Sequence, residues 1–300
     1  MMIAWVAYAL TALVATLVAG NNLSAVAGTL IGSRILSQKA GALLGSVGYV
    51  IGLWAQGERL RSAVSYTLPE VGYFSVLVLG ISVVLFTAAL WFRAPLSLTM
   101  ALVASSVGVS LRVGYNLNVA FVFVVVLTWV LAPLTSALVA PFLYRAFVAK
   151  RVDYVWRTLR VYRILLVAVS FFTAYTLGAN TLGLVASVAG YSLFTRSLVS
   201  VCAVFGSFLL SRGVVKRVGS EMYAMSLPVA LVSLVASSSL VEVATQFSVP
   251  LSNTQTLTAS VFGLGLSKGF RMIRPLPFLV IALTWALTPV VGVLLGYALA

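Results

Sequence analysis

The chain has 300 residues, of which 62% are hydrophobic and 8% are charged, and its 19 basic and 5 acidic residues give a formal net charge of +14. Water-soluble domains are about half apolar and about a quarter charged, so this composition excludes a soluble globular protein and predicts an integral membrane protein. With no His, one Cys and five acidic residues, the chain has almost nothing from which to build a His-based triad, a zinc site or a carboxylate metal cluster. We therefore predict that it is not an enzyme and has no cofactor.

Ten stretches of the chain contain no Asp, Glu, Lys or Arg: 1–33, 40–57, 71–92, 94–111, 113–144, 164–195, 197–211, 222–241, 243–267 and 275–300. About 20 apolar residues cross a bilayer as a helix, so these stretches predict about ten transmembrane helices. The polar connections between them are too short to form a soluble domain. The expected fold is an all-α polytopic membrane protein in the cell membrane.

Basic residues lie mostly at the edges of the apolar stretches, which is typical of orientation signals rather than of nucleic-acid binding. The densest group comprises Arg145, Lys150, Arg151, Arg157, Arg160 and Arg163. We interpret residues 145–157 as a basic cytoplasmic connection. Electrostatic anchoring of this group to anionic lipid head groups fits the same placement.

An internal repeat organises the chain. Three short sequences recur in the same order: LTWVLAP at 127–133 as LTWALTP at 283–289, PLSLT at 95–99 as PLSNT at 250–254, and GNN at 20–22 as ANT at 179–181. Their offsets of 156, 155 and 159 residues are nearly equal, which is hard to obtain by chance. The chain is therefore predicted to consist of two homologous membrane repeats, 1–144 and 158–300.

Fused repeats are typical of secondary transporters, in which the two halves enclose a site near the bilayer midplane. We expect inverted repeats, each with a re-entrant helical hairpin built on residues 94–111 or 250–266. Proline is well tolerated in the first turn of a helix, so Pro95 and Pro250 are expected to open short helices whose N-termini bear Ser and Thr side chains. Two such N-termini that meet at a pseudo-two-fold axis would form an anion site.

The third repeat match, GNN at 20–22 with ANT at 179–181, places polar residues near the start of each half. Asn21 and Asn22 are expected to interrupt an apolar helix, and interrupted helix at this depth is tolerated only where it lines a protein-enclosed cavity. A single buried Ser, Thr or Asn often just joins helices, but repeat-matched pairs favour ligand binding. The candidate substrate-binding residues are Asn21, Asn22, Ser97, Thr99, Asn180, Thr181, Ser252, Asn253 and Thr254.

Glu242 is the only acidic residue inside a long apolar run. Carboxylates inside a membrane are costly and are functional candidates for that reason, so Glu242 is a candidate proton acceptor for coupling. The alternative is that Glu242 lies near the membrane interface and has no role in transport.

These motifs resemble those of the inorganic phosphate transporter (PiT) family. In that family each half carries a Gly-Ala-Asn-Asp motif and a Pro-Val-Ser-Thr-Thr-His motif, followed by a Trp-x-x-x-Pro helix. Here residues 19–22 read Ala-Gly-Asn-Asn, residues 178–181 read Gly-Ala-Asn-Thr, and both Trp-x-x-x-Pro segments are present at 129–133 and 285–289. The resemblance covers nearly the whole chain and implies an inverted-repeat symporter that moves an inorganic oxyanion with a coupling cation.

The chain departs from the family pattern at its charged positions. Asn22 and Thr181 replace the two motif aspartates, and Met100 and Gln255 replace the two motif histidines. Neutral oxygens bind a hard cation more weakly than carboxylates do, which weakens the case for sodium coupling while the hydroxyl groups of the anion site are retained.

We predict a secondary transporter for an inorganic oxyanion, most simply phosphate, that works by alternating access with a proton or sodium ion as the coupling cation. A permease for sulfate or another anion is an alternative, as is a non-transporting homologue that serves as a membrane scaffold or regulatory partner. The expected partners are the oxyanion and the lipid bilayer, with no nucleic acid. The sequence leaves the oligomeric state open, a homo-oligomer included.

Overall fold

The computed structural model describes residues 2–69, 72–91, 96–148, 155–221, 226–267 and 275–300, and every regular element in these ranges is a helix. The first half contains α1 (Met2–Gly32), α2 (Gln38–Gln56), η1 (Gly57–Arg59), α3 (Leu60–Thr67), α4 (Tyr73–Trp91), α5 (Leu98–Val113) and α6 (Val119–Phe147). The second half contains α7 (Val155–Leu177), η2 (Gly178–Leu182), α8 (Gly183–Val188), α9 (Leu193–Glu221), α10 (Leu227–Gln246), α11 (Asn253–Ser267) and α12 (Pro275–Leu299).

The helices have the length and the surface that a bilayer requires. Five spans among the described residues are long and apolar enough to cross a membrane: Met2–Gly32, Val119–Phe147, Trp156–Val188, Leu227–Gln246 and Ile281–Leu299. Large apolar side chains face outward, as on α6, where Phe123, Leu138 and Phe142 are 66%, 75% and 70% exposed. The predicted all-α polytopic membrane fold is confirmed.

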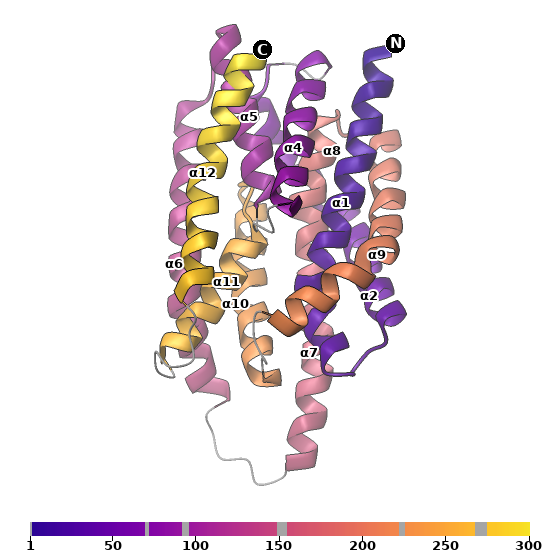
Figure 1. Cartoon of the computed structure of the whole chain (residues 1–300), viewed down its shortest axis with the longest axis vertical. Helices are drawn as coiled ribbons and strands as arrows, with labels where there is room; N and C mark the ends of the chain where they lie inside the picture. Colours follow the sequence, from indigo (N-terminus) through magenta and orange to yellow (C-terminus); the bar gives the residue numbers. More distant parts are fainter. Residues whose placement is uncertain (1, 70–71, 92–95, 149–154, 222–225, 268–274) are drawn as a thin grey trace.

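The two halves run in opposite directions (Figure 1). Both termini lie at the same end of the molecule, while α6 ends and α7 begins at the other end. The matched long helices α6 and α12 therefore point in opposite directions, which is the inverted arrangement that the sequence predicts.

Two helical hairpins, α4 with α5 and α10 with α11, enter from opposite ends and bring their tips to mid-height (Figure 1). Ser97 caps α5, because its side chain accepts a hydrogen bond from Met100 N at 3.3 Å. The proline does not open the helix in the second hairpin: Pro250 lies in the non-helical segment 249–252, and α11 begins at Asn253. The corresponding expectation for Pro95 falls outside the described residues.

The halves interlock through close helix crossings. Helix α5 packs against α12 of the other half, and α6 packs against α11. A Cβ on Gly108 would lie 2.2 Å from Val293 O, and a Cβ on Gly263 would lie 1.9 Å from Ala137 O. Gly108 matches Gly263 at an offset of 155 and Ala137 matches Val293 at 156, so the two crossings are copies of each other. Only glycine permits these backbone approaches.

The polar segment near the start of each half has a different backbone in each copy. Helix α1 continues without a break through Asn21 and Asn22, so the predicted interruption there is wrong. Its counterpart contains one π-helical turn, η2, at Gly178–Leu182. Such π turns are rare and occur frequently at functional sites.

The predicted connection at 145–157 lies partly outside the described residues, since residues 149–154 are not among them. Helix α6 continues past residue 144 to Phe147, and α7 begins at Val155. The boundaries at 144 and 158 stay predictions.

Candidate functional site

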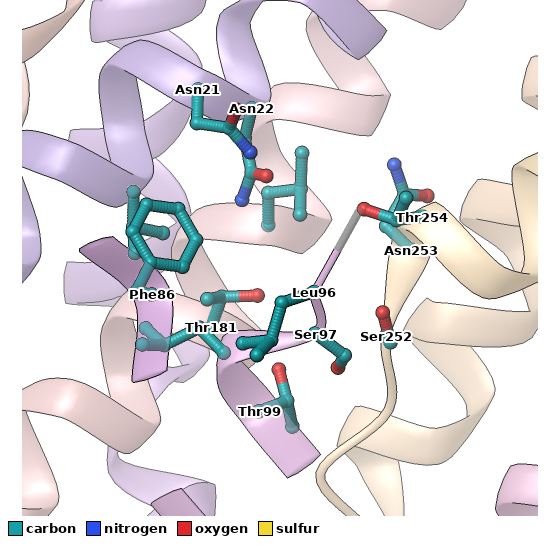
Figure 2. Close-up of a pocket in the computed structure, with 13 residues that line it drawn as sticks. Asn21, Asn22, Phe86, Leu96, Ser97, Thr99, Thr181, Ser252, Asn253 and Thr254 are labelled. Carbon is teal, nitrogen blue, oxygen red and sulfur yellow. The ribbon is translucent and has the colours of Figure 1, made fainter. Parts of the chain in front are cut away.

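A pocket lies where the two hairpin tips meet α1 and the α7 to η2 junction (Figure 2). It has about 310 Å³ of empty space, part of which is open to solvent. Eight of the nine candidate binding residues line it: Asn21, Asn22, Ser97, Thr99, Thr181, Ser252, Asn253 and Thr254. Both halves therefore contribute to one polar chamber.

Both hairpins present a helix N-terminus to this pocket. Ala101 N donates to Ser97 O at 3.1 Å and Thr256 N donates to Ser252 O at 3.4 Å. The backbone N-H groups that precede these bonds, in the first turns of α5 and α11, have no carbonyl acceptor within their own helix, and that of Met100 donates to the capping Ser97 side chain. The positive ends of two helix dipoles thus meet at the pocket, which favours a bound anion.

Several polar side chains around the pocket have no hydrogen-bond partner within the described part of the chain. They are the amide of Asn22 and the hydroxyls of Thr99, Thr181, Ser252 and Thr254. Many buried hydroxyls elsewhere in the protein bond to a carbonyl of their own helix, as Thr11 does to Ala7 O at 2.7 Å. Thr99, Thr181 and Ser252 are buried, and Asn22 and Thr254 are partly buried. Because a polar group that is removed from water and left without a partner is costly, these side chains are suited to hold a polar ligand or water.

Asn180 is the candidate that does not line the pocket. Its Nδ2 donates to Thr245 Oγ1 at 2.9 Å and to Val249 O at 3.1 Å, and its Oδ1 accepts from Leu251 N at 3.0 Å. The side chain is fully buried and its amide is fully engaged. Asn180 therefore braces the tip of the second hairpin instead of facing a ligand.

A second brace comes from the repeated Trp-x-x-x-Pro segment. Trp129 Nε1 on α6 donates to Pro250 O at 2.9 Å. Its repeat counterpart, Trp285, has a buried Nε1 with no partner among the described residues. The hairpin tip of the second half is thus held by side chains from both halves.

Sequence reasoning missed the apolar walls of the pocket, which are formed by Val18, Phe86, Leu96, Leu98 and Leu177. A signal was present, because Val18 and Leu177 match at the offset of 159 that relates the polar segments. Each lies about one helical turn before the polar pair of its half, on the same side of the helix.

Glu242 does not line the pocket. It lies on α10 one turn before Gln246, whose Nε2 donates to Glu242 Oε1 and, at 3.0 Å, to Gln56 Oε1. Arg59 donates to Gln246 O at 3.3 Å, so its positive charge lies at the C-terminus of α10. The other carboxylate oxygen of Glu242 is buried without a partner among the described residues. The hydrogen bonds of Gln246 with Gln56 and Arg59 therefore join α2 and η1 of the first half to the C-terminal end of α10 in the second.

The described residues that line the pocket are all uncharged. No cluster of three or more His, Cys, Asp or Glu that could hold a metal ion occurs in the described ranges. The described lining residues therefore offer N-H groups, hydroxyls and helix dipoles, which suit an anion better than a hard cation.

Comparison with known proteins gives one consistent result. The model of the phosphate transporter family matches residues 18–153 and again residues 147–296. A protein of Methanocaldococcus jannaschii, provisionally named a phosphate permease, is 23% identical over 243 residues that cover 80% of each chain. A solved structure described as the sodium-dependent phosphate transporter shares the fold, with a TM-score of 0.87 at 16% identity over 99% of this chain and 98% of that one.

Proposed function

Because this chain belongs to the phosphate transporter family, we propose that it carries phosphate across the membrane as a secondary transporter. The anion binds in the pocket between the N-termini of α5 and α11. The two interlocked halves then expose that pocket to one side of the membrane and the other in turn.

The convergence of the two hairpin tips carries this proposal. Ser97 and Thr99 from the first half and Ser252 and Thr254 from the second surround the same space, together with first-turn N-H groups that have no carbonyl acceptor in their own helix. A tetrahedral oxyanion presents acceptors in four directions, which matches donors that arrive from opposite sides. Donors to a charged ligand form stronger hydrogen bonds than donors to a neutral one.

A coupling cation, either a proton or a sodium ion, is the second part of the proposal. The structural relative described as sodium-dependent supports sodium. The described residues that line the pocket include no carboxylate, which a sodium ion prefers, and this supports a proton instead. Glu242 is the candidate carrier of that proton, at a distance from the anion and next to the tip of the second hairpin.

Uptake of radiolabelled phosphate by proteoliposomes tests the function. We expect uptake by wild-type protein that rises with either an imposed sodium gradient or an imposed pH gradient. Double substitution of Thr99→Val and Thr254→Val removes two pocket hydroxyls and should raise the KM for phosphate at least tenfold. Thr128→Val is the matched control, because the Thr128 hydroxyl bonds to Val124 O of its own helix on the outer surface.

The same vesicles separate the alternatives. Sulfate uptake in place of phosphate uptake would indicate a different anion permease, which the donors of the pocket do not exclude. Correctly inserted protein that takes up neither anion would indicate a non-transporting scaffold. For Glu242, loss of pH-driven stimulation in Glu242→Gln supports the proton route, and an unchanged response removes this residue from the mechanism.

A further inference from the structure

Ser237 on α10 does not bond to a carbonyl of its own helix, as several other buried helical serines do; like Ser136 of α6, it bonds to another helix. Ser46, Ser82 and Ser238 each donate to the carbonyl four residues earlier in their own helix, at 2.7, 2.8 and 2.6 Å. Ser237, although fully buried, instead reaches across the hairpin to Asn253 and Thr256 on α11. A hydroxyl that leaves its local acceptor for a side chain on another helix restricts the orientation of that side chain.

The distances define a short chain of hydrogen bonds. Ser237 Oγ donates to Asn253 Oδ1 at 2.6 Å, and Ser237 Oγ and Thr256 Oγ1 are 2.7 Å apart. An amide oxygen only accepts, so Ser237 is the donor to Asn253 Oδ1. The Thr256 hydroxyl can then donate to Ser237 Oγ or to Asn253 O, which is 3.1 Å from it. Asn253 is 3% exposed and lines the pocket, so with its oxygen engaged the group left for a ligand is Nδ2, a pure donor.

At the matched, described positions of the first half this arrangement does not occur. Asn253 matches Leu98 and Ser237 matches Ser82, both at an offset of 155, and the Ser82 hydroxyl bonds to Val78 O. This chain of hydrogen bonds is therefore a feature of the second half. Because it occupies the oxygen of the Asn253 amide, only the NH₂ group of that amide remains available to a ligand.

We propose that Ser237 is a positioning residue that fixes the Asn253 amide with its NH₂ group toward the anion. This inference rests on the proposed function, since it concerns the anion pocket. Loss of the Ser237 hydroxyl lets the amide rotate and present its oxygen, which repels an oxyanion that has no proton. Sulfate has no proton at neutral pH, whereas hydrogen phosphate can donate its own.

The first test compares Ser237→Ala with Ser238→Ala in proteoliposomes, using phosphate as the transported probe and sulfate as the competitor. Ser238 is equally buried on the same helix, but its hydroxyl bonds only to Leu234 O. We expect Ser237→Ala to raise the KM for phosphate about three- to tenfold at unchanged kcat, and to raise the Ki of sulfate by a larger factor. Ser237→Thr keeps the hydroxyl and should restore both values.

A second variant keeps the test decisive if the first alters folding. Asn253→Asp leaves one carboxylate oxygen for Ser237 and turns the other toward the anion, so competition by sulfate should fall more than tenfold while phosphate uptake falls less. Equal effects of Ser237→Ala and Ser238→Ala, or equal losses for both anions in Asn253→Asp, would overturn the inference and leave transport intact. A wild-type protein that binds neither anion would overturn the proposed function as well.

Discussion

Asn180 and Thr181 are neighbours in η2, yet their side chains have different surroundings. The Asn180 amide bonds to three groups of the second hairpin, while the Thr181 hydroxyl faces the pocket without a partner among the described residues. One residue fixes the position of the hairpin tip, and the other is available to the ligand.

This division predicts different consequences for the two substitutions. Asn180→Ala leaves the buried Leu251 N-H and Val249 carbonyl unpaired and should cost about 2 to 4 kcal/mol of stability. Thr181→Val keeps the volume and should leave the melting temperature unchanged while it weakens phosphate uptake. Melting of the purified proteins in detergent and uptake by proteoliposomes check the two parts, and an equally stable Asn180→Ala protein would contradict the bracing role.

The sequence could identify the segments of the site but not the direction of each side chain. The repeat match pairs Asn21 with Asn180 and Asn22 with Thr181, and three of these four residues line the pocket. Asn180 differs because it lies in the π-helical turn η2, which α1 lacks, so matched residues face different neighbours. An extra residue in one helical turn leaves little trace in composition or periodicity.

At the scale of elements, glycine crossings bring helices of the two halves into close backbone contact. Gly263 on α11 lies against Ala137 of α6, and Gly108 on α5 lies against Val293 of α12. Helices that meet through glycine gain dispersion contacts and weak hydrogen bonds from closely approached backbones, which matters in a bilayer because lipid offers no hydrophobic drive for helices to associate.

Gly263→Ala should therefore be destabilising although alanine favours helix formation. Its Cβ would lie 1.9 Å from the Ala137 carbonyl oxygen, so the backbone of α6 or α11 must move, at a cost of about 1 to 3 kcal/mol or more. Gly28→Ala on α1 is the control, because a Cβ there meets no atom within 4 Å. We expect that variant to melt at or slightly above the wild-type temperature. Equal melting temperatures for both variants would refute the tight crossing.

The hairpins show which element boundaries the sequence could predict. The repeated Pro-x-Ser-x-Thr segments mark the break between the two arms of each hairpin, because proline and hydroxyl residues separate apolar runs there. The predicted hairpin residues, 94–111 and 250–266, were too few: they contain only the second arms, α5 and α11, and the first arms are α4 and α10. The start of α11 was predicted too early, at Pro250. Trp129 and Asn180 bond to the backbone of residues 249–251 and hold it in a non-helical conformation, and such contacts between distant segments cannot be read from local spacing.

At the scale of the molecule, neither half has its main packing partners within itself. Helix α1 packs most extensively against α9, α5 against α12 and α6 against α11, so each of these contacts crosses between the halves. The repeat offsets predicted two inverted halves, but they carried no information on how the halves exchange partners.

A chain divided within residues 145–157 should accordingly reassemble only when both parts are present. We expect the two segments, 1–150 and 151–300, to co-purify after co-expression in membranes and to restore phosphate uptake. Each segment expressed alone should aggregate on extraction, because its glycine-lined faces lack their partners. A single segment that purifies as a stable, monodisperse species would contradict the shared core.

The two halves contribute matching backbone segments to the pocket, but the side chains on these segments differ. Leu98 on one side corresponds to Asn253 on the other, and Asn22 corresponds to Thr181. With identical halves, the inward-open and outward-open forms would be related by the two-fold axis in the membrane plane and would have equal free energy. Because the matched side chains differ, the inward-open and outward-open forms should bind the anion with unequal dissociation constants. The anion should then load more readily on the membrane face where the dissociation constant is lower and leave more readily on the other face.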